Sequence, residues 1–507
     1  MGSSGWVLPE EVLAGAPTHT PRPGELADLE LILSGAFAPL TGLLTSADLA
    51  SMSRRGRLAD GTPWSVPVTL EVPTDLIAGM DLGDPLHRAL VVTDFEGTPV
   101  AAVDVVDAWP TRDGMTGVGG PVRRINDPFP GPFASLRRPP AAVRERLPDG
   151  RVLGVVADAP LHRPQLAQIV LATRTLQAHP LVLIPVAEPT AAGLPPEALV
   201  RCVLAARDRM PAATIVTVPL RRRANEIHDA LARARVAQAY GATHLLATGP
   251  AMSGGGPRVI VPRELAYDSR DGQWRTRDDI PARNQRLALG DDEIQDLLDR
   301  GFGLPEWHTP PAVARELARA LPPRRWRGLV LFFTGRSGSG KSAIARRVAA
   351  ALRENGERTV TLLDADLVRR ELADAPEPAG GGAGDRTARR VGWVAAEVAR
   401  HRGVAICSPA PPSAAALRYA RAAAQAAGAG FVLVALSTPA EVCRGRVAAG
   451  LVDRPGAREG AGVDGRSDDG YHEPADADLV LDTTDLSVEA AVAAVLEHLT
   501  QNGWTEP

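Results

Sequence analysis

The sequence predicts an α/β protein whose N-terminal part is rich in β-structure and whose two following parts each contain a parallel sheet. From residue 151 onward, short apolar runs alternate with stretches of helical periodicity, the order expected for the strands and helices of a parallel sheet. An apolar run at 329–333, a glycine-rich loop and a helical stretch at 343–355 repeat that order further along the chain. Before residue 150 the apolar segments are short and interrupted by Pro and Gly, which is typical of strands joined by turns.

The length of the chain is consistent with three domains. It has 507 residues, of which 45% are hydrophobic, and a domain takes roughly 100–200 residues. The changes of pattern predict domains at 1–150, 151–325 and 326–507. A stretch rich in Pro and Arg at 128–140 is expected to link the first two.

Apolar runs and their flanking residues predict the individual elements. In the first domain, residues 64–72 and 89–93 are predicted strands. In the second, strands are expected at 152–157, 181–186, 214–218 and 243–247, and helices at 164–177 and 224–240. Helical stretches at 291–300 and 312–320 then lead to a proline pair at 322–323. In the third, the predicted strands are 329–333, 359–363, 404–407 and 431–436.

Composition argues against several classes of protein. The net charge is −4 at pH 7 and the arginines are interspersed with acids, which does not favour a nucleic-acid-binding surface. Cys202, Cys407 and Cys443 are far apart and lack metal-ligand spacing, which fits a reducing compartment. No apolar run approaches the ~20 residues of a membrane-spanning helix, and the N-terminus lacks the pattern of a secretory signal. We expect a cytoplasmic protein that binds neither nucleic acid nor membrane.

Of the 56 Lys and Arg residues, one is a lysine. This residue, Lys341, lies in the segment 335–342, GRSGSGKS, which fits the phosphate-loop pattern G-x-x-x-x-G-K-[ST]. A compact ammonium fits among phosphate oxygens as a point charge, whereas a guanidinium is planar and bulkier. A strand before the loop and a helix after it let backbone N–H groups and the helix N-terminus face an anion together. The sequence therefore predicts a nucleoside triphosphate site here.

Two carboxylates, Asp364 and Asp366, follow the predicted strand at 359–363. The carboxyl ends of parallel strands form the edge where ligands bind in such folds. There the carboxylates are suited to hold Mg²⁺ through water or to accept a proton from an attacking hydroxyl. The alternative is a solvated turn or a helix cap.

Taken together, these segments resemble ATP sulfurylases fused at their C-terminus to an adenylylsulfate (APS) kinase domain, over nearly the whole chain. The matching stretches are 29–42 (LELILSGAFAPLTG), 57–62 (RLADGT), 304–307 (LPEW), 335–342, 363–366 (LDAD), 389–392 (RRVG) and 438–443 (TPAEVC). The resemblance implies a β-rich PUA-like N-terminal domain, a nucleotidyltransferase-type α/β domain, and a P-loop kinase α/β domain with a parallel sheet.

The resemblance also assigns the residues of a kinase site. ATP would be bound by the loop residues Gly335, Arg336, Ser337, Gly338, Ser339, Gly340, Lys341 and Ser342, and by Arg446, which matches a position near the adenine. The catalytic residues would be Lys341, Asp364, Asp366 and Ser408, with Ser342 and Asp364 holding the metal. Arg369 and Arg386 match arginines that grip the phosphosulfate of APS, and Arg454 stands where the family has a lid lysine.

The sulfurylase pattern Q-T-R-N-P-x-H-x-x-H reads VADAPLHRPQ at 156–165. Asp158 stands where the family pattern has its positively charged arginine. A carboxylate at the place where sulfate should bind reverses the sign of the local electrostatic potential. We therefore expect a degenerate sulfurylase site, with His162 and Arg163 as its remnant. His162 either touches a phosphate or is an ordinary loop histidine. The basic run at 221–223 either replaces the anion site or is a solvated surface.

The acceptor side of the kinase also departs from the family. Residues 379–384, AGGGAG, replace an element that carries an aromatic residue, two residues are missing after Arg386, and Ala410 stands in place of a tyrosine. The leading prediction is an APS kinase, converting ATP and APS to ADP and PAPS, fused to an inactive sulfurylase-like region. The alternatives are a kinase of another small acceptor and a non-catalytic, nucleotide-sensing regulator of sulfate activation. ATP and Mg²⁺ are the expected cofactors, and a homo-oligomer is expected.

Overall fold

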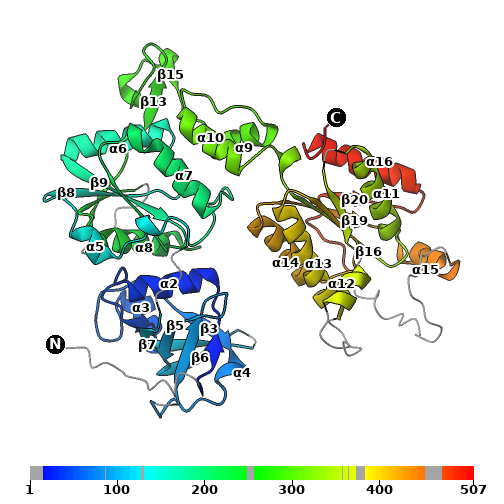
Figure 1. Ribbon diagram of the computed structural model, residues 1–507, viewed down its shortest axis with the longest axis horizontal. Coiled ribbons are helices and arrows are strands. Elements are labelled where there is room, and N and C mark those ends of the chain that lie inside the picture. Colours follow the sequence, from blue (N-terminus) through cyan, green and yellow to red (C-terminus); the bar gives the residue numbers. More distant parts are fainter. Residues whose placement is uncertain are drawn as a thin grey trace. The chain divides into compact units, whose positions relative to one another are not determined.

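The computed structural model (Figure 1) describes residues 15–85, 87–112, 114–126, 131–247, 256–356, 358–363, 365–372, 383–450 and 471–506. Of residues 366, 369, 370, 383 and 384 it describes the backbone alone. The chain divides into two compact units, Met1–Gly290 with Leu304–Glu316, and Asp291–Gly303 with Leu317–Pro507. The three domain boundaries read from the sequence stay predictions.

The first unit begins with a seven-stranded sheet. Its strands are β1 (Thr18–His19), β2 (Gly42–Leu43), β3 (Leu70–Pro73), β4 (Ala89–Thr93), β5 (Pro99–Asp104), β6 (Asp107–Arg112) and β7 (Met115–Arg124). Their pairings are antiparallel, except that β1 runs parallel to β4. The accompanying helices are α2 (Pro23–Leu33), α3 (Ser46–Arg55) and α4 (Thr74–Ile77). The β-rich character predicted for this part is confirmed.

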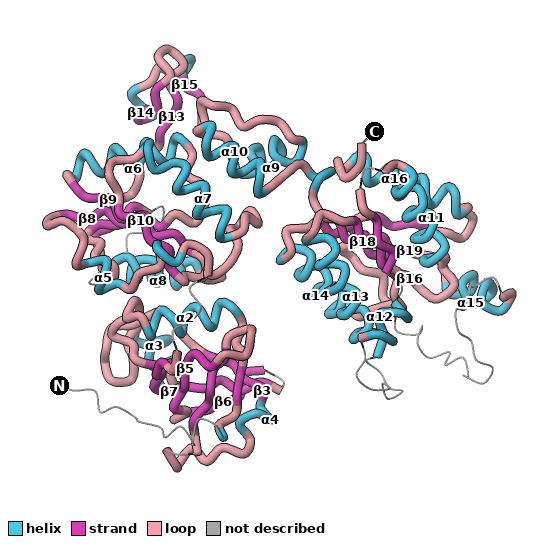
Figure 2. The backbone as a smooth tube through the Cα atoms, in the orientation of Figure 1, coloured by secondary structure: helices cyan, strands magenta, loops and turns pink. Residues whose placement is uncertain are grey.

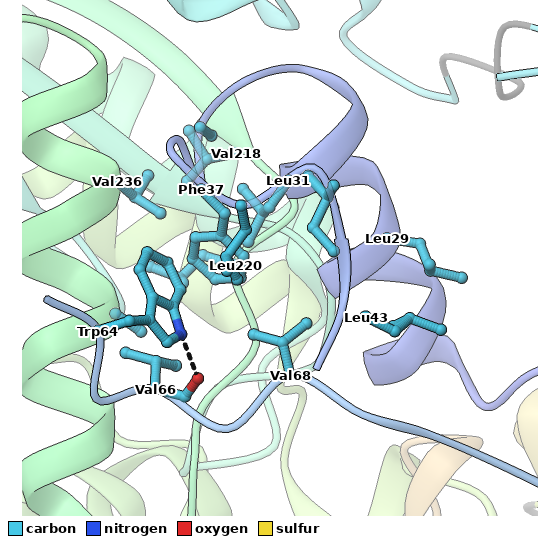
Figure 3. Packing of buried hydrophobic residues seen from close by; sticks show 14 of the residues in the cluster. Leu29, Leu31, Phe37, Leu43, Trp64, Val66, Val68, Val218, Leu220 and Val236 are labelled. Atoms are coloured by element: carbon cyan, nitrogen blue, oxygen red, sulfur yellow. Dashed lines mark hydrogen bonds between the residues drawn. The ribbon is translucent and has the colours of Figure 1, made fainter. Parts of the chain in front are cut away.

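The strand predicted at 64–72 is only partly present, because β3 begins at Leu70. The indole of Trp64 is buried and donates from Nε1 to a carbonyl oxygen two residues along, at 2.6 Å (Figure 3). Phe37 meets the same ring edge to face at 5.7 Å. Pro67 has no N–H to give to a neighbouring strand. The apolar alternation in this segment therefore reflects burial in the core and not membership of a ladder.

The β-rich part and the α/β part that follows it share one hydrophobic core (Figure 3). Leu31 and Phe37 pack in the same cluster as Val218, Leu220 and Val236. The described part of the predicted linker at 128–140 is held in place by a contact with α2. Arg137 donates from Nε to Oε1 of Glu30 on α2 at 2.9 Å, and α5 (Pro140–Arg144) begins at the linker's last residue.

A five-stranded parallel sheet forms the centre of the α/β part, in the order β10-β9-β8-β11-β12. The strands are β8 (Arg151–Val156), β9 (Ala178–Pro185), β10 (Thr214–Val218), β11 (His244–Leu246) and β12 (Arg258–Ile260). Figure 2 shows α6 (Arg163–Leu176) and α7 (Pro196–Ala206) on one face and α8 (Glu226–Ala239) on the other. A small antiparallel sheet follows, formed by β13 (Leu265–Asp268), β14 (Gln273–Thr276) and β15 (Gln285–Arg286). The four predicted strands and two predicted helices are all confirmed.

A second parallel sheet, in the order β17-β18-β16-β19-β20, forms the centre of the other unit. The strands are β16 (Leu329–Gly335), β17 (Val360–Leu363), β18 (Val404–Cys407), β19 (Gly430–Leu436) and β20 (Leu479–Leu481). Successive residues of β16 face opposite sides: Leu329 and Leu331 pack with α11 (Lys341–Glu354) and α16 (Val488–Gln501). Val330 and Phe332 pack with α13 (Ala383–Arg400) and α14 (Ala414–Ala426). Helices thus cover both faces of the sheet (Figure 1), and the predicted parallel sheet is confirmed.

The remaining helices are α9 (Asp291–Arg300), α10 (Pro311–Ala320), α12 (Ala365–Glu371) and α15 (Ala440–Ala448). The three cysteines are buried and form no disulfide. In the described part of the chain, no helix combines the length and the apolar character needed to cross a membrane.

Candidate functional site

The glycine-rich loop joins the middle strand of the second unit's sheet to helix α11. β16 ends at Gly335 and α11 begins at Lys341. Gly338 and Gly340 have φ of 84° and 95°, values that L-residues with a Cβ rarely adopt. A Cβ on Gly338 would also lie 2.6 Å from the carbonyl oxygen of Cys443 on α15. The glycines are therefore required by the curvature of the loop and by its close contact with α15.

Lys341 lies inside the curve of this loop. Its Nζ donates to the carbonyl oxygens of Gly335 at 2.8 Å and Arg336 at 2.9 Å, and the residue is buried. As the first residue of α11, it lies where the helix dipole favours negative charge. Ser342 follows it and is exposed. This geometry matches a site for the phosphates of a nucleotide.

The structure brings several other predicted residues to the same edge of the sheet. Ser408 follows the end of β18, the strand next to β16, and is half-buried. Asp366 and Arg369 lie on α12, and the structure describes only the backbone of these two residues. Asp364, Arg454 and the stretch 379–382 lie outside the described residues.

The acceptor-side residue Arg386 lies in the first turn of α13 and is exposed. Its neighbour Asp385 accepts a hydrogen bond from the backbone N–H of Ser413 at 2.6 Å. Ser413 is the N-cap of α14, and its Oγ accepts from the N–H of Ala416. The start of α13 is thereby attached to the start of α14, directly after the loop that carries Ser408.

Arg446 is engaged beside the phosphate loop. Its guanidinium donates to the hydroxyl and the carbonyl oxygen of Thr483 and to the carbonyl oxygen of Thr484. Sequence reasoning did not single out Thr483. Its only sequence signal is its position two residues after the short apolar run of β20.

The loop that carries the altered sulfurylase motif joins β8 to α6. Asp158 pairs with Arg233 of α8, with 2.7 Å between Oδ2 and Nη1. The same guanidinium reaches Asp229 at 2.5 Å. Sequence reasoning missed Arg233, which supplies a positive charge next to the carboxylate that replaces the family's cation. One guanidinium shared by two carboxylates leaves this cluster with a net negative charge. Residues 248–251, the other altered sulfurylase segment, lie outside the described residues.

His162 and Arg163 contact the segment that precedes α10. His162 is buried, with Nδ1 2.9 Å from Oγ1 of Thr309 and its ring 4.8 Å from that of His308. Arg163 donates from Nε to the carbonyl oxygen of Glu306 at 2.6 Å. The structure thus places both residues in packing contacts at the N-terminus of α6.

Burial lowers the pKa of His162 to about 3, with a smaller contribution from His308. An unfolded chain would protonate this imidazole below about pH 6.5, whereas the folded chain keeps it neutral down to about 3. The unfolded state therefore binds more protons as pH falls through this window, and folding stability declines with it. Between pH 6.5 and 5 the loss from His162 is about 2 kcal/mol, at about 1.4 kcal/mol per pH unit.

Urea unfolding of the first unit at several pH values measures this effect. A His162→Gln variant has no ionisable group at this position and should have a shallower decline of stability over the same range. An equal decline in the two proteins would contradict the assignment.

Two of the three arginines in the basic run at 221–223 form ion pairs within the protein. Arg221 and Arg223 both pair with the buried Asp28 of α2, at 2.8 and 2.6 Å. Arg223 is itself buried and lies over the ring of Phe37. Only Arg222 is exposed in this run. The sequence could not reveal this because Asp28 lies 195 residues before Arg223.

Comparisons with known proteins agree with the order of the domains. The PUA-like domain family model matches residues 13–116, the ATP-sulfurylase model 134–257 and the adenylylsulphate kinase model 327–482. A sulfate adenylyltransferase of Aspergillus terreus is 28% identical over 562 residues, covering 99% of this chain and 98% of the relative. That of Yarrowia lipolytica is 29% identical over 540 residues, covering 95% and 93%.

Among solved structures, a hexameric APS kinase from Thiobacillus denitrificans is 30% identical, with a TM-score of 0.71, covering 98% of this chain and 96% of that one. The similarity therefore spans both units and is not limited to the phosphate loop. The chain belongs to the family of fused ATP sulfurylases and APS kinases, with a PUA-like N-terminal domain, an ATP-sulfurylase domain and a C-terminal APS kinase domain built on a parallel sheet.

Proposed function

We propose that this protein is an APS kinase that transfers the γ-phosphoryl group of ATP to the 3′-hydroxyl of APS, and that its sulfurylase region does not adenylylate sulfate. The observation that carries the first part is the phosphate loop on the middle strand of the kinase sheet, with Lys341 inside its curve. The observation that carries the second is the ion pairing around the altered sulfurylase loop.

Phosphoryl transfer requires positioning and charge neutralisation more than covalent chemistry. The loop N–H groups and Lys341 would bind the phosphates of ATP, while the hydroxyl of Ser342 and Asp364 would hold Mg²⁺, which neutralises charge on the β- and γ-phosphates. Ser342 is exposed at the N-terminus of α11 and so fits this role. The proposal keeps the remaining loop residues and Arg446 as ATP-binding residues.

On the acceptor side, Arg369, Arg386 and Arg454 would bind the phosphosulfate. A guanidinium fits such a group because it donates two parallel hydrogen bonds. Asp366 would accept the proton of the attacking 3′-hydroxyl as its oxygen bonds to the γ-phosphorus and ADP leaves. Ser408 would lie in the same site. The attachment of Asp385 to Ser413 supports this, because it holds the helix that carries Arg386 next to the loop after β18.

The altered sulfurylase loop and its neighbour Arg233 offer sulfate little positive charge. Arg233 is shared by Asp158 and Asp229, and Arg163 lies 3.6 Å from the carboxylate of Glu306. His162 is neutral at physiological pH because burial lowers its pKa to about 3. In the described part of this loop and of α8, Arg163 and Arg233 each already have a carboxylate partner. A sulfate ion would have to compete with carboxylates of the protein for both.

One assay tests both parts of the proposal. The protein is incubated with Mg-ATP and either sulfate or APS, and pyrophosphate, ADP and PAPS are measured. We expect ADP and PAPS from APS, and no pyrophosphate above background from sulfate. Sulfate adenylyltransferase activity is a second candidate function, favoured by the name of the curated relatives. Pyrophosphate release that depends on sulfate would support this activity against our proposal. Binding of ATP without ADP formation from APS would contradict the kinase assignment.

A cytosolic location and a homo-oligomeric state complete the proposal. A reducing compartment agrees with three buried cysteines that form no disulfide. The hexameric APS kinase, which matches this chain along nearly its whole length, supports self-association. Light scattering during size-exclusion chromatography measures the oligomeric state directly.

A further inference from the structure

Three side chains meet behind the phosphate loop, and we call them the loop-support cluster: Thr438, Arg446 and Thr483. They come from the residues after β19, from α15 and from the residues after β20. Both threonines are buried, at 2% and 4% exposure. The cluster contacts the loop through one hydrogen bond, from Oγ1 of Thr483 to the carbonyl oxygen of Ser339 at 2.9 Å.

The directions of the hydrogen bonds in the cluster follow from counting protons. A threonine hydroxyl has one proton to donate and two lone pairs to accept with. Thr483 uses its proton on Ser339, because a carbonyl oxygen can only accept. Its two lone pairs then accept from Nη1 of Arg446 at 3.1 Å and from the hydroxyl of Thr438 at 2.7 Å. The hydroxyl of Thr483 is thus fully used, and Thr438 must be the donor in the bond between them.

The bond to Ser339 determines the orientation of one peptide group in the loop. In a trans peptide the C=O and the following N–H point in opposite directions. Since the carbonyl of Ser339 points to Thr483, the N–H of Gly340 must point away from it. Gly340 directly precedes Lys341 and is the N-cap of α11. Its N–H is thereby turned away from the cluster, toward the side of the loop on which a phosphate would lie.

We propose that Thr483 is a positioning residue for the phosphate loop, acting through the carbonyl of Ser339, and that Thr438 and Arg446 hold its hydroxyl in the required direction. The inference rests on the proposed kinase function and adds a residue that does not itself touch substrate. Gly338 supports it independently, because the loop is also in close contact with α15 at that residue. In this arrangement the loop is shaped before nucleotide binds, so less ordering is needed on binding.

A binding experiment tests the role of Thr483 without relying on turnover. Thr483→Val keeps the shape of the side chain and removes its hydroxyl. The dissociation constant of Mg-AMPPNP should rise about tenfold, the size expected for loss of one buried hydrogen bond. The affinity for adenosine, measured by competition, should stay unchanged, because adenosine carries no phosphate and Arg446 keeps its bonds to the carbonyl oxygens of residues 483 and 484. Thr483→Ser retains the hydroxyl and should restore most of the affinity.

Thr484→Val is the matched control, because the hydroxyl of Thr484 bonds to Asp482 and not to the loop. It should bind Mg-AMPPNP as wild type does. Thr438→Val leaves Thr483 able to donate to the carbonyl of Ser339 but removes the hydrogen bond that Thr438 donates to Thr483. The loss of affinity for Mg-AMPPNP should therefore be smaller than in Thr483→Val. If Thr483→Val does not fold, the other proteins still test the cluster. Their affinity for Mg-AMPPNP should decrease from wild type to Thr483→Ser to Thr438→Val.

Wild-type affinity in a folded Thr483→Val protein would overturn the inference, as would an equal loss of adenosine and Mg-AMPPNP binding. The proposed function fails separately. Wild-type protein that binds Mg-AMPPNP but forms no PAPS from APS would contradict the kinase reaction and leave the support of the loop intact.

Discussion

Replacing Lys341 with alanine should lower kcat/KM for formation of PAPS by a factor of about 10² or more. The ammonium lies inside the curve of the phosphate loop and would neutralise charge that develops on the transferred phosphoryl group. Removal of one preorganised donor of this kind typically costs about 10²–10³ in rate. Initial rates with saturating APS and varied Mg-ATP measure the effect.

Two further variants separate charge from shape. Lys341→Arg keeps the charge but replaces a compact ammonium with a planar fork, and we expect most of the activity to be lost. Arg347→Ala removes a cation from the same helix whose side chain is largely exposed and pairs with Glu489 at the surface. It should retain wild-type activity. An active Lys341→Ala enzyme would refute the assignment of the phosphate site.

The second large effect is expected at Asp28, where replacement by asparagine should destabilise the first unit by about 3–5 kcal/mol. Breaking a buried ion pair by neutralising one partner costs about this much, because a buried charge is left uncompensated. Arg223 would be that charge. Burial lowers the pKa of Arg223 and raises the pKa of Asp28, while attraction between the two groups opposes both shifts. Neutralising Asp28 removes the largest attraction that offsets the desolvation of Arg223.

Native-state hydrogen exchange measures this change locally, which is preferable because a chain of two units need not unfold in one step. Protection should fall in α2 and in the segment around Arg223. The control is Asp271→Asn, which breaks an exposed pair with Arg275 in the same unit and should cost about 0–1 kcal/mol. Equal losses of protection in the two variants would contradict a special role for the buried carboxylate.

The phosphate loop could be predicted from the sequence because its determinants are local. The strand, the three glycines and Lys341 lie within fourteen consecutive positions, 329–342, and backbone strain at Gly338 and Gly340 permits few other residues. The parallel sheets were predicted for the same reason, since buried strands are short apolar runs. Residues 64–69 misled the prediction because alternating burial in a core resembles the alternation of a strand.

The charged sites could not be predicted in this way. The sequence predicts an uncompensated carboxylate at Asp158 in the sulfurylase loop, and Arg233, 75 positions later, compensates it only because α8 packs beside β8. The sequence leaves the run at 221–223 as either an anion site or a solvated surface, whereas in the structure Arg221 and Arg223 bind a carboxylate from α2. Each of these residues is one member of a pair whose partner is distant in the chain.

The sequence by itself determined the fold class, the location of the glycine-rich loop and the family, because periodicity, glycine conformation and motif spacing act over a few residues. The tertiary structure decided which charges remain available to a ligand and which hydroxyl holds the loop. Electrostatic and hydrogen-bonding partners are chosen by proximity in space, and Thr483 reaches Ser339 across 144 residues of chain.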